Sequence, residues 1–256
     1  PIQQKAIKPI TLKRDVIAQA QSGTGKTATF TIGALSNVDV ANNSTQVLVL
    51  SPTKELTRQT AKVFEGIGSM IKGLKIQAAY GGSAVEETSS FSNKNTPHVI
   101  CGCPGRVYDM LRRERLSCKK IKLIILDEAD EMLDMGFAED LEAILESTPK
   151  ERQTVLFSAT MPPRIDSIAR RHQREPIRIT IQRSSTEAGT LPLVKQSAYM
   201  IPRHHKAAAL GRILDIEAPE AAIVFCRTRG EVDQLTETLN GRGYRAEALH
   251  GGMDQE

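Results

Sequence analysis

The chain has 256 residues, of which 40% are hydrophobic and 25% are charged. This usage is that of an ordinary globular protein. It excludes a disordered chain, a collagen and a coiled coil, and no apolar run approaches the roughly 18 residues that a membrane-spanning helix needs. The net charge of +4, from 34 basic and 30 acidic residues, permits nucleic-acid binding but is too small to indicate it.

Short apolar runs alternate with segments of helical period along the first 181 residues. Seven runs rich in Val, Ile and Leu predict strands, at Val16–Ala20, Gln46–Leu50, Lys75–Tyr80, His98–Cys103, Lys122–Asp127, Gln153–Ser158 and Ile177–Ile181. Helices are predicted between them, at Thr27–Leu35, Lys54–Ile71, Gly105–Arg113, Ala138–Glu146 and Pro163–His172. The strands are apolar throughout rather than alternating, which is typical of a parallel sheet covered on both faces. We therefore predict an α/β domain with a doubly wound parallel sheet over residues 1–181.

A second, shorter unit follows. Residues 182–192 lose all periodicity and gather Ser, Thr and Gly, which predicts an interdomain linker. Residues 193–256 then predict strands at Lys195–Ile201, Ala221–Cys226 and Tyr244–Leu249, and helices at His204–Ile216 and Gly230–Asn240. These elements make about half of a minimal α/β domain, so we expect the second unit to be incomplete and poorly stable alone.

The segment Ala20–Thr27 reads Ala-Gln-Ser-Gly-Thr-Gly-Lys-Thr and lies between a predicted strand and a predicted helix. This is the context of a phosphate-binding loop, whose residues would be Ser22, Gly23, Thr24, Gly25, Lys26 and Thr27. The glycines let backbone N–H groups turn toward phosphate oxygens, Lys26 would reach the β- and γ-phosphates, and Thr27 would ligate Mg²⁺. The alternative, a Gly/Ser surface loop, does not account for the flanking strand and helix.

A pair of carboxylates, Asp127 and Glu128, directly follows the buried run Lys122–Leu126. We expect this pair to meet Lys26 at one edge of the sheet. Asp127 would hold Mg²⁺, and Glu128 would orient and deprotonate the attacking water. A helix N-terminus that collects acids against its dipole would explain the charges but not their position at a strand end.

Several motifs occur together and in order. They are Ala20–Thr27, Pro52-Thr53-Lys54-Glu55-Leu56, Gly81-Gly82, Pro104-Gly105-Arg106, Asp127-Glu128-Ala129-Asp130 and Ser158-Ala159-Thr160. Through them the whole chain resembles the DEAD-box ATP-dependent RNA helicases, which implies a RecA-like α/β domain followed by a truncated second one. Residues 1 to about 135 look most like the translation initiation factor 4A branch, and the later part looks more like bacterial members.

The choice of basic residues changes at the same place. There are 12 Lys and 6 Arg up to Met135, but 3 Lys and 13 Arg from Gly136 onward. This shift falls inside the first predicted domain rather than at the linker. It leads to the hypothesis that the chain joins two sources of different coding bias.

The resemblance implies further residues of the nucleotide site. Gln3 matches the end of the family's adenine-reading motif, and a Gln amide can both donate to and accept from an adenine edge. Ser158 and Thr160 match small hydroxyl residues that would hydrogen-bond the acidic motif at Asp130 and link the nucleotide state to domain closure. On their own, the same two residues would also suit an ordinary capping site between a strand and a helix.

The resemblance also implies sequence-independent contacts to the RNA backbone. In this chain they would come from Pro52, Thr53, Lys54, Gly81, Gly82, Gly105, Arg106, Arg227 and Thr228. A solvated loop remains the alternative for Arg227 and Thr228. Lys54 replaces the usual Arg and loses its planar fork, while Cys103 replaces the usual Thr and loses a hydroxyl donor. We expect these two departures to weaken RNA binding.

The implied activity is RNA-stimulated ATP hydrolysis, with Mg²⁺, coupled to local unwinding of RNA duplexes. The family's arginine finger lies in a later motif, beyond Glu256, so we expect this chain to be a fragment that binds ATP·Mg²⁺ weakly and hydrolyses little. The alternatives are an ATP-gated RNA clamp that does not unwind and a DNA-directed translocase of the same superfamily. Separation of a duplex would distinguish the first, and stimulation by DNA would distinguish the second.

The four cysteines, Cys101, Cys103, Cys118 and Cys226, show no C-x-x-C spacing. This indicates neither a structural metal site nor a disulfide framework, and it favours a reducing, cytoplasmic compartment. We expect a monomer that binds single-stranded or duplex RNA and has no membrane segment.

Overall fold

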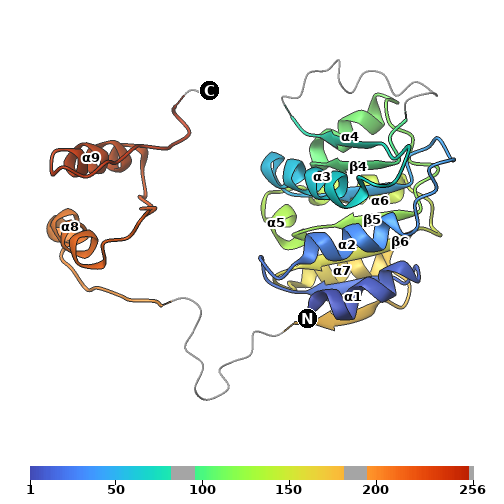
Figure 1. Ribbon diagram of the computed structural model, residues 1–256, viewed down its shortest axis with the longest axis horizontal. Coiled ribbons are helices and arrows are strands. Elements are labelled where there is room, and N and C mark those ends of the chain that lie inside the picture. The colour runs from blue at the N-terminus through green and yellow to red at the C-terminus, as the bar shows by residue number, and fades with distance from the viewer. Residues whose placement is uncertain (82–95, 182–194, 254–256) are drawn as a thin grey trace. The chain divides into compact units, whose positions relative to one another are not determined.

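The computed structural model describes residues 1–81, 96–181 and 195–253, and it divides the chain into two compact units, Pro1–Ser185 and Thr186–Glu256 (Figure 1). The predicted linker, residues 182–192, lies outside the described residues, and so does Gly82. Within the described ranges, no helix combines the length and the apolar composition that crossing a bilayer requires.

The first unit is built on a seven-stranded sheet in the order β3-β4-β2-β5-β6-β1-β7, in which every pairing is parallel. The strands are β1 (Val16–Gln19), β2 (Val47–Leu50), β3 (Ile76–Ala79), β4 (Val99–Gly102), β5 (Leu123–Leu126), β6 (Gln153–Ser158) and β7 (Ile177–Thr180). All seven predicted strands are thus confirmed, together with the doubly wound parallel architecture.

Helices cover both faces of this sheet (Figure 1). One face packs against α1 (Ile2–Thr11), α2 (Lys26–Leu35) and α3 (Lys54–Gly68), and the other packs against α4 (Pro104–Arg112), α5 (Ala129–Asp134), α6 (Ala138–Glu146) and α7 (Pro163–His172). Strand β2 shows why its run is apolar throughout. Val47 and Val49 enter the first of these cores, and Leu48 and Leu50 enter the second. The five predicted helices are present, and α1 and α5 are additional to them.

The second unit contains a one-turn 3-10 helix, η1 (Arg203–His205), and two α-helices, α8 (Lys206–Glu217) and α9 (Arg229–Asn240). The predictions of strands at 195–201, 221–226 and 244–249 are wrong, because no strand occurs within residues 195–253. A strand forms only when its backbone groups pair with a neighbour and its side chains are covered. Here Phe225 and Leu249 remain 92% and 89% exposed.

Asp15, just before β1, links this strand to the start of β6 and to the segment that precedes β7. Its side chain is buried, and its carboxylate accepts hydrogen bonds from the backbone N–H groups of Thr154 (2.7 Å) and Arg174 (2.6 Å). We predict that Asp15→Ala lowers the free energy of unfolding by about 2 kcal/mol, because a buried backbone N–H then lacks an acceptor. Urea denaturation against the exposed-site control Asp134→Ala checks this, and equal midpoints for Asp15→Ala and the unmutated chain would contradict it.

Candidate functional site

The predicted motifs of the first unit lie at one edge of the sheet, because parallel strands all end on the same side. Strands β1, β6 and β5 are neighbours in the sheet, and they lead into the phosphate loop, the Ser158–Thr160 motif and the acidic pair. Strands β2, β4 and β3 occupy the other half, and they lead into the three motifs expected to bind RNA. The strand order therefore separates the nucleotide motifs from the RNA motifs along this edge.

The phosphate loop has the backbone that its glycines allow. Gly23 and Gly25 have φ of 78° and 88°, in the left-handed region that favours glycine, and Gly25 is the residue on which α2 begins. A Cβ on Gly25 would lie 2.9 Å from Nε2 of Gln3, a residue of α1. The structure thus brings Gln3 against the loop that contains Ser22 and Thr24.

Lys26, Asp127 and Glu128 converge between the ends of β1 and β5. Nζ of Lys26 lies 3.8 Å from Oε1 of Glu128. Lys26 is 6% exposed and Asp127 is 3% exposed. Within the described part of the chain, neither Nζ of Lys26 nor Oδ1 of Asp127 has a hydrogen-bond partner. A buried cation and a buried anion without such partners are costly, so this site is suited to a polar ligand that supplies them.

The environment of Asp127 resists ionisation. Burial raises the pKa of its carboxyl, the charge of Lys26 lowers it and the charge of Glu128 raises it, so that the pKa reaches about 6. A nearby divalent cation would favour the ionised form. Asp127 is therefore a buried carboxyl whose negative charge is poorly compensated by its surroundings.

The described residues also limit how a metal could be held. They contain no group of three or more His, Cys, Asp or Glu side chains placed to hold a metal ion on its own. The oxygen-bearing residues of this part of the site are Thr27 in the first turn of α2, Asp127 and Glu128, whose Oε1 is 3.8 Å from the Lys26 ammonium. Since Mg²⁺ is commonly held by one or two protein oxygens and by substrate phosphates, this sparse set fits a metal that arrives with a nucleotide.

Asp130 connects the acidic motif to the end of β6. Its Oδ2 accepts hydrogen bonds from the backbone N–H and the hydroxyl of Thr160, both at 2.8 Å, and its own N–H donates to Oγ of Ser158 at 3.3 Å. Burial raises the pKa of Asp130, but the hydrogen bonds from Thr160, Ser158 and Ala159 outweigh it, and the net pKa is lowered. The contacts expected of Ser158 and Thr160 are thus present.

On the other half of the edge, α3 contacts the ends of β3 and β4. Thr53 caps α3, since its hydroxyl oxygen accepts a hydrogen bond from the N–H of Leu56 at 3.2 Å. The ammonium of Lys54 lies 5.6 Å from the centroid of the Tyr80 ring, within cation–π range. Tyr80 precedes Gly81, so this contact brings two of the predicted RNA segments together. Sequence reasoning missed Tyr80, because nothing local links it to Lys54.

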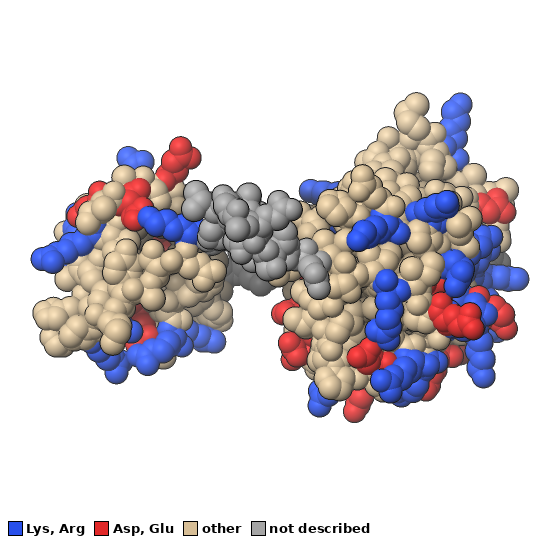
Figure 2. Space-filling view, turned by 90° about the horizontal axis from the view of Figure 1, so that it is seen from below, with Lys and Arg blue, Asp and Glu red and all other residues tan. Residues whose placement is uncertain are grey.

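Cys103 begins α4 but does not cap it with a side-chain hydrogen bond. Its Sγ lies 3.3 Å from Oγ1 of Thr57 in α3, and burial raises the pKa of the thiol. Gly105 and Arg106 follow in the first turn of α4, and Arg106 pairs with Asp109 at 3.3 Å. On the face drawn in Figure 2, basic side chains of the first unit lie among acidic ones, so charge alone does not mark an RNA surface.

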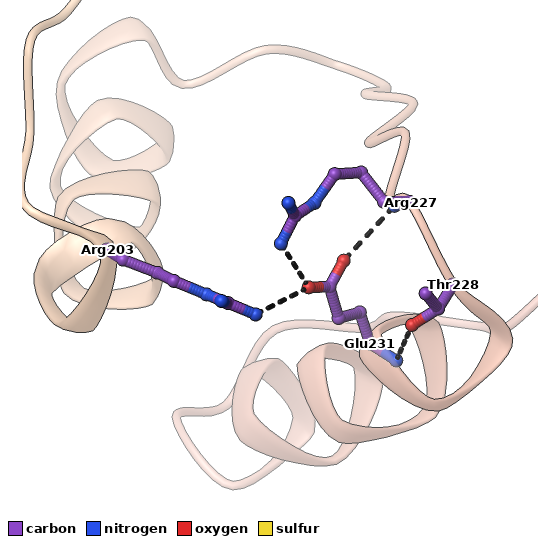
Figure 3. A network of polar contacts seen from close by, with 4 residues as sticks. All are labelled: Arg203, Arg227, Thr228 and Glu231. Carbon is purple, nitrogen blue, oxygen red and sulfur yellow. Dashed lines mark hydrogen bonds and ion pairs between the residues drawn. The ribbon is translucent and has the colours of Figure 1, made fainter.

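The remaining two predicted RNA residues lie in the second unit. Thr228 caps α9 through its hydroxyl oxygen, which accepts a hydrogen bond from the N–H of Glu231. Arg227 pairs with the carboxylate of Glu231 at 2.8 Å (Figure 3). Both residues therefore make hydrogen bonds within the second unit. The sequence had predicted only contacts to RNA phosphate for them.

Comparisons with known proteins agree with this arrangement. The family model described as DEAD/DEAH box helicase matches residues 1–168. Proteins named DEAD-box ATP-dependent RNA helicase CshA are 46% identical in Geobacillus kaustophilus and 42% identical in Streptococcus pneumoniae, both over the whole chain. The chain covers 54% and 48% of these two proteins, so it spans about half the length of the curated relatives it matches.

Two solved structures are similar over 99% of the chain. One is a DEAD box protein from the hyperthermophile Methanococcus jannaschii, with 34% identity, a TM-score of 0.67 and 67% of that chain covered. The other is a variant of Saccharomyces cerevisiae dbp5, bound to a gle1 variant and ip6, with 31% identity, a TM-score of 0.76 and 62% of that chain covered. The similarity extends over both units.

Proposed function

Because the chain belongs to the DEAD/DEAH box helicase family, we propose that it is the nucleotide-binding and part of the RNA-binding region of an ATP-dependent RNA helicase. The observation that carries this proposal is the meeting of Lys26, Asp127 and Glu128 at one edge of the sheet, beside a glycine loop with the backbone of a phosphate site. The protein would couple hydrolysis of ATP to local separation of RNA strands.

The chain's own residues divide the work at the nucleotide. The backbone of Ser22–Gly25 and the ammonium of Lys26 would bind the phosphates, and the Gln3 amide would bind the adenine edge. Thr27 and Asp127 would hold Mg²⁺, which supplies positive charge at the phosphates. Glu128, which is beside Lys26 and half-buried, would orient the attacking water and accept its proton.

The contact between Asp130 and Thr160 would link the state of the bound nucleotide to domain closure. Asp130 lies three residues after Asp127, and Thr160 lies just beyond the end of β6. A shift of the acidic motif on hydrolysis would therefore be transmitted to the segment that follows β6 through two hydrogen bonds of 2.8 Å. Ser158 would support the same movement through the backbone N–H of Asp130.

RNA would lie along the half of the edge formed by β2, β4 and β3. Thr53, Lys54, Gly105 and Arg106 stand there at the first turns of α3 and α4, where backbone N–H groups and cationic side chains favour phosphate. Pro52 and Gly81 belong to the same edge, since they follow β2 and β3. These would be contacts to phosphate, so RNA binding would not depend on base sequence.

Phosphate release from ATP, measured with and without single-stranded RNA, tests the proposed function. For this chain we expect slow phosphate release, as the sequence predicts. For a protein with the full length of its relatives, we expect RNA to raise the rate more than DNA of the same sequence does, and we expect short RNA duplexes to separate only with ATP·Mg²⁺. Failure to bind ATP·Mg²⁺ would overturn the proposal. RNA binding without strand separation would favour a clamp, and equal stimulation by DNA would favour a DNA-directed translocase.

The two departures from the family pattern lead to a prediction. The double variant Cys103→Thr with Lys54→Arg should bind single-stranded RNA about threefold more tightly, because it adds a hydroxyl donor and a bidentate guanidinium. The new hydroxyl should also cap α4, which raises the free energy of unfolding by about 1 kcal/mol. Fluorescence anisotropy and urea denaturation measure these effects.

The variant Cys103→Ala with Lys54→Arg is the matched control for the hydroxyl. It should gain only the part of the RNA affinity that Lys54→Arg supplies, and its free energy of unfolding should not rise. If the Cys103→Thr double variant binds RNA like the unmutated chain, the two departures do not weaken RNA binding and the prediction is wrong.

A further inference from the structure

Two arginines from separate segments of the second unit meet at one carboxylate. Arg203 lies in η1 and Arg227 precedes α9, and the Nη2 atoms of both point to Oε1 of Glu231, at 3.4 Å and 2.8 Å (Figure 3). The resemblance to helicases had indicated Arg227 alone. Arg203 is brought beside it only by the fold, since 24 residues separate the two along the chain.

The pair is open to solvent. The side chains of Arg203 and Arg227 are 80% and 70% exposed, and that of Glu231 is 33% exposed. Ion pairs in such surroundings are weak and exchange readily with other ions. Two guanidinium groups facing one carboxylate also leave one positive charge in excess, so a second anion or a more highly charged one would be favoured there.

Glu231 is itself held in place at the start of α9. Its Oε2 accepts a hydrogen bond from the backbone N–H of Arg227 at 3.2 Å, and its own N–H donates to Oγ1 of Thr228 at 3.2 Å. The hydrogen bonds from Arg227 lower the pKa of its carboxyl, and Arg203 contributes to the same effect. Glu231 is therefore a fixed anion that occupies the space between the two cations.

We infer that Arg203 and Arg227 form a binding site for one phosphodiester group of the RNA strand, and that Glu231 occupies this site until RNA displaces it. The guanidinium N–H groups can donate to the oxygens of a phosphate as they do to those of a carboxylate. One phosphate can also accept hydrogen bonds from both guanidinium groups at once. This inference rests on the proposed RNA-binding function. It adds Arg203 as a phosphate-binding residue and Glu231 as an internal competitor.

The proposed role of Glu231 predicts that removing its charge strengthens RNA binding instead of weakening it. Glu231→Gln keeps an oxygen that can accept from the N–H of Arg227 but removes the competing charge. It should therefore tighten binding of a labelled single-stranded RNA by about three- to fivefold in fluorescence anisotropy with the whole chain. A purely structural role for Glu231 predicts no gain in RNA affinity, because the variant would then only weaken the ion pairs with Arg203 and Arg227.

Substitutions of the arginines complete the experiment. Arg203→Ala and Arg227→Ala should each weaken RNA binding about three- to fivefold. The double variant should lower the slope of log affinity against log salt by about 0.7, the change for one phosphate on a single strand. Arg203→Lys should fall between Arg203→Ala and the unmutated chain. Arg245→Ala is the charge-matched control, since Arg245 is exposed and follows the turn at the other end of α9.

The possible outcomes separate the inference from the proposed function. If the chain binds RNA but Glu231→Gln binds no more tightly, or Arg203→Ala behaves like Arg245→Ala, the inference is overturned while the proposed function stands. If the unmutated chain binds no RNA, both are overturned. Thermal denaturation of each variant confirms that the compared chains are folded.

Discussion

Lys26→Met is expected to weaken the binding of ATP·Mg²⁺ by about 100-fold or more. The Lys26 ammonium is buried at the start of α2 and, within the described residues, has no hydrogen-bond partner, only the Glu128 carboxylate at 3.8 Å. Its charge is therefore available to phosphate oxygens, and charge-assisted hydrogen bonds to phosphate are among the strongest in proteins. Losing about 3 kcal/mol of such interaction corresponds to a hundredfold change in affinity.

Titration with a fluorescent ATP analogue measures this loss. Lys62→Met, on the exposed side of α3, removes the same charge away from the loop and should leave the affinity within about twofold. A Lys26→Met variant that binds the analogue within about threefold of the unmutated chain would show that Lys26 does not face the phosphates.

Asp127→Asn is expected to stabilise the nucleotide-free protein and, at the same time, to remove its Mg²⁺-dependent nucleotide binding. The carboxyl of Asp127 has a pKa of about 6 in the folded chain against an ordinary value of 3.8. Between these two pH values the folded chain binds a proton that the unfolded chain has released. The free energy of unfolding therefore falls as the pH rises through this window, and the full loss remains above it.

The asparagine variant avoids this loss because it has no charge to bury. Its advantage should be on the order of 3 kcal/mol at pH 7, shrink steadily as the pH falls below 6, and vanish below about pH 4. Urea denaturation at several pH values measures it, with the exposed-site variant Asp134→Asn as control. Destabilisation by Asp127→Asn at pH 7 would mean that the ionised carboxylate is satisfied in the apo protein.

The location of the first-unit motifs could be predicted from the sequence for a physical reason. Strands buried on both faces give continuous apolar runs, and Val47–Leu50 and Leu123–Leu126 are of this kind. Parallel pairing then fixes where the next residues must go, so residues after each strand meet at one edge. This topology alone was enough to place Lys26 and Asp127 at the same edge of the sheet.

Two helices of the first unit show what such patterns miss. Helix α1 buries Ile2, Ala6 and Ile10 at intervals of four residues, which is a helical signal, but Pro9 lies inside it and argues against a helix. Helix α5 has only six residues and follows Glu128, whose φ of 52° is unusual for a residue with a side chain. Local helix propensity therefore predicts neither α1 nor α5.

The second unit shows the opposite error. The apolar segment that contains Ile223 and Phe225 has the composition of a strand. Composition indicates that a segment would suit a sheet, but it does not show that a neighbouring strand is there to pair with it. Contacts made by long side chains are equally invisible in the sequence. Lys54 over Tyr80, and Arg203 beside Arg227, depend on how helices pack and not on any spacing.

The most direct test of the account is a crystal structure of the chain with a non-hydrolysable ATP analogue and Mg²⁺. We predict phosphates against Lys26 and the backbone of Gly23 and Gly25, with the metal on the side of Thr27 and Asp127. Phosphates bound at any other place, with Lys26 still paired only to Glu128, would contradict it.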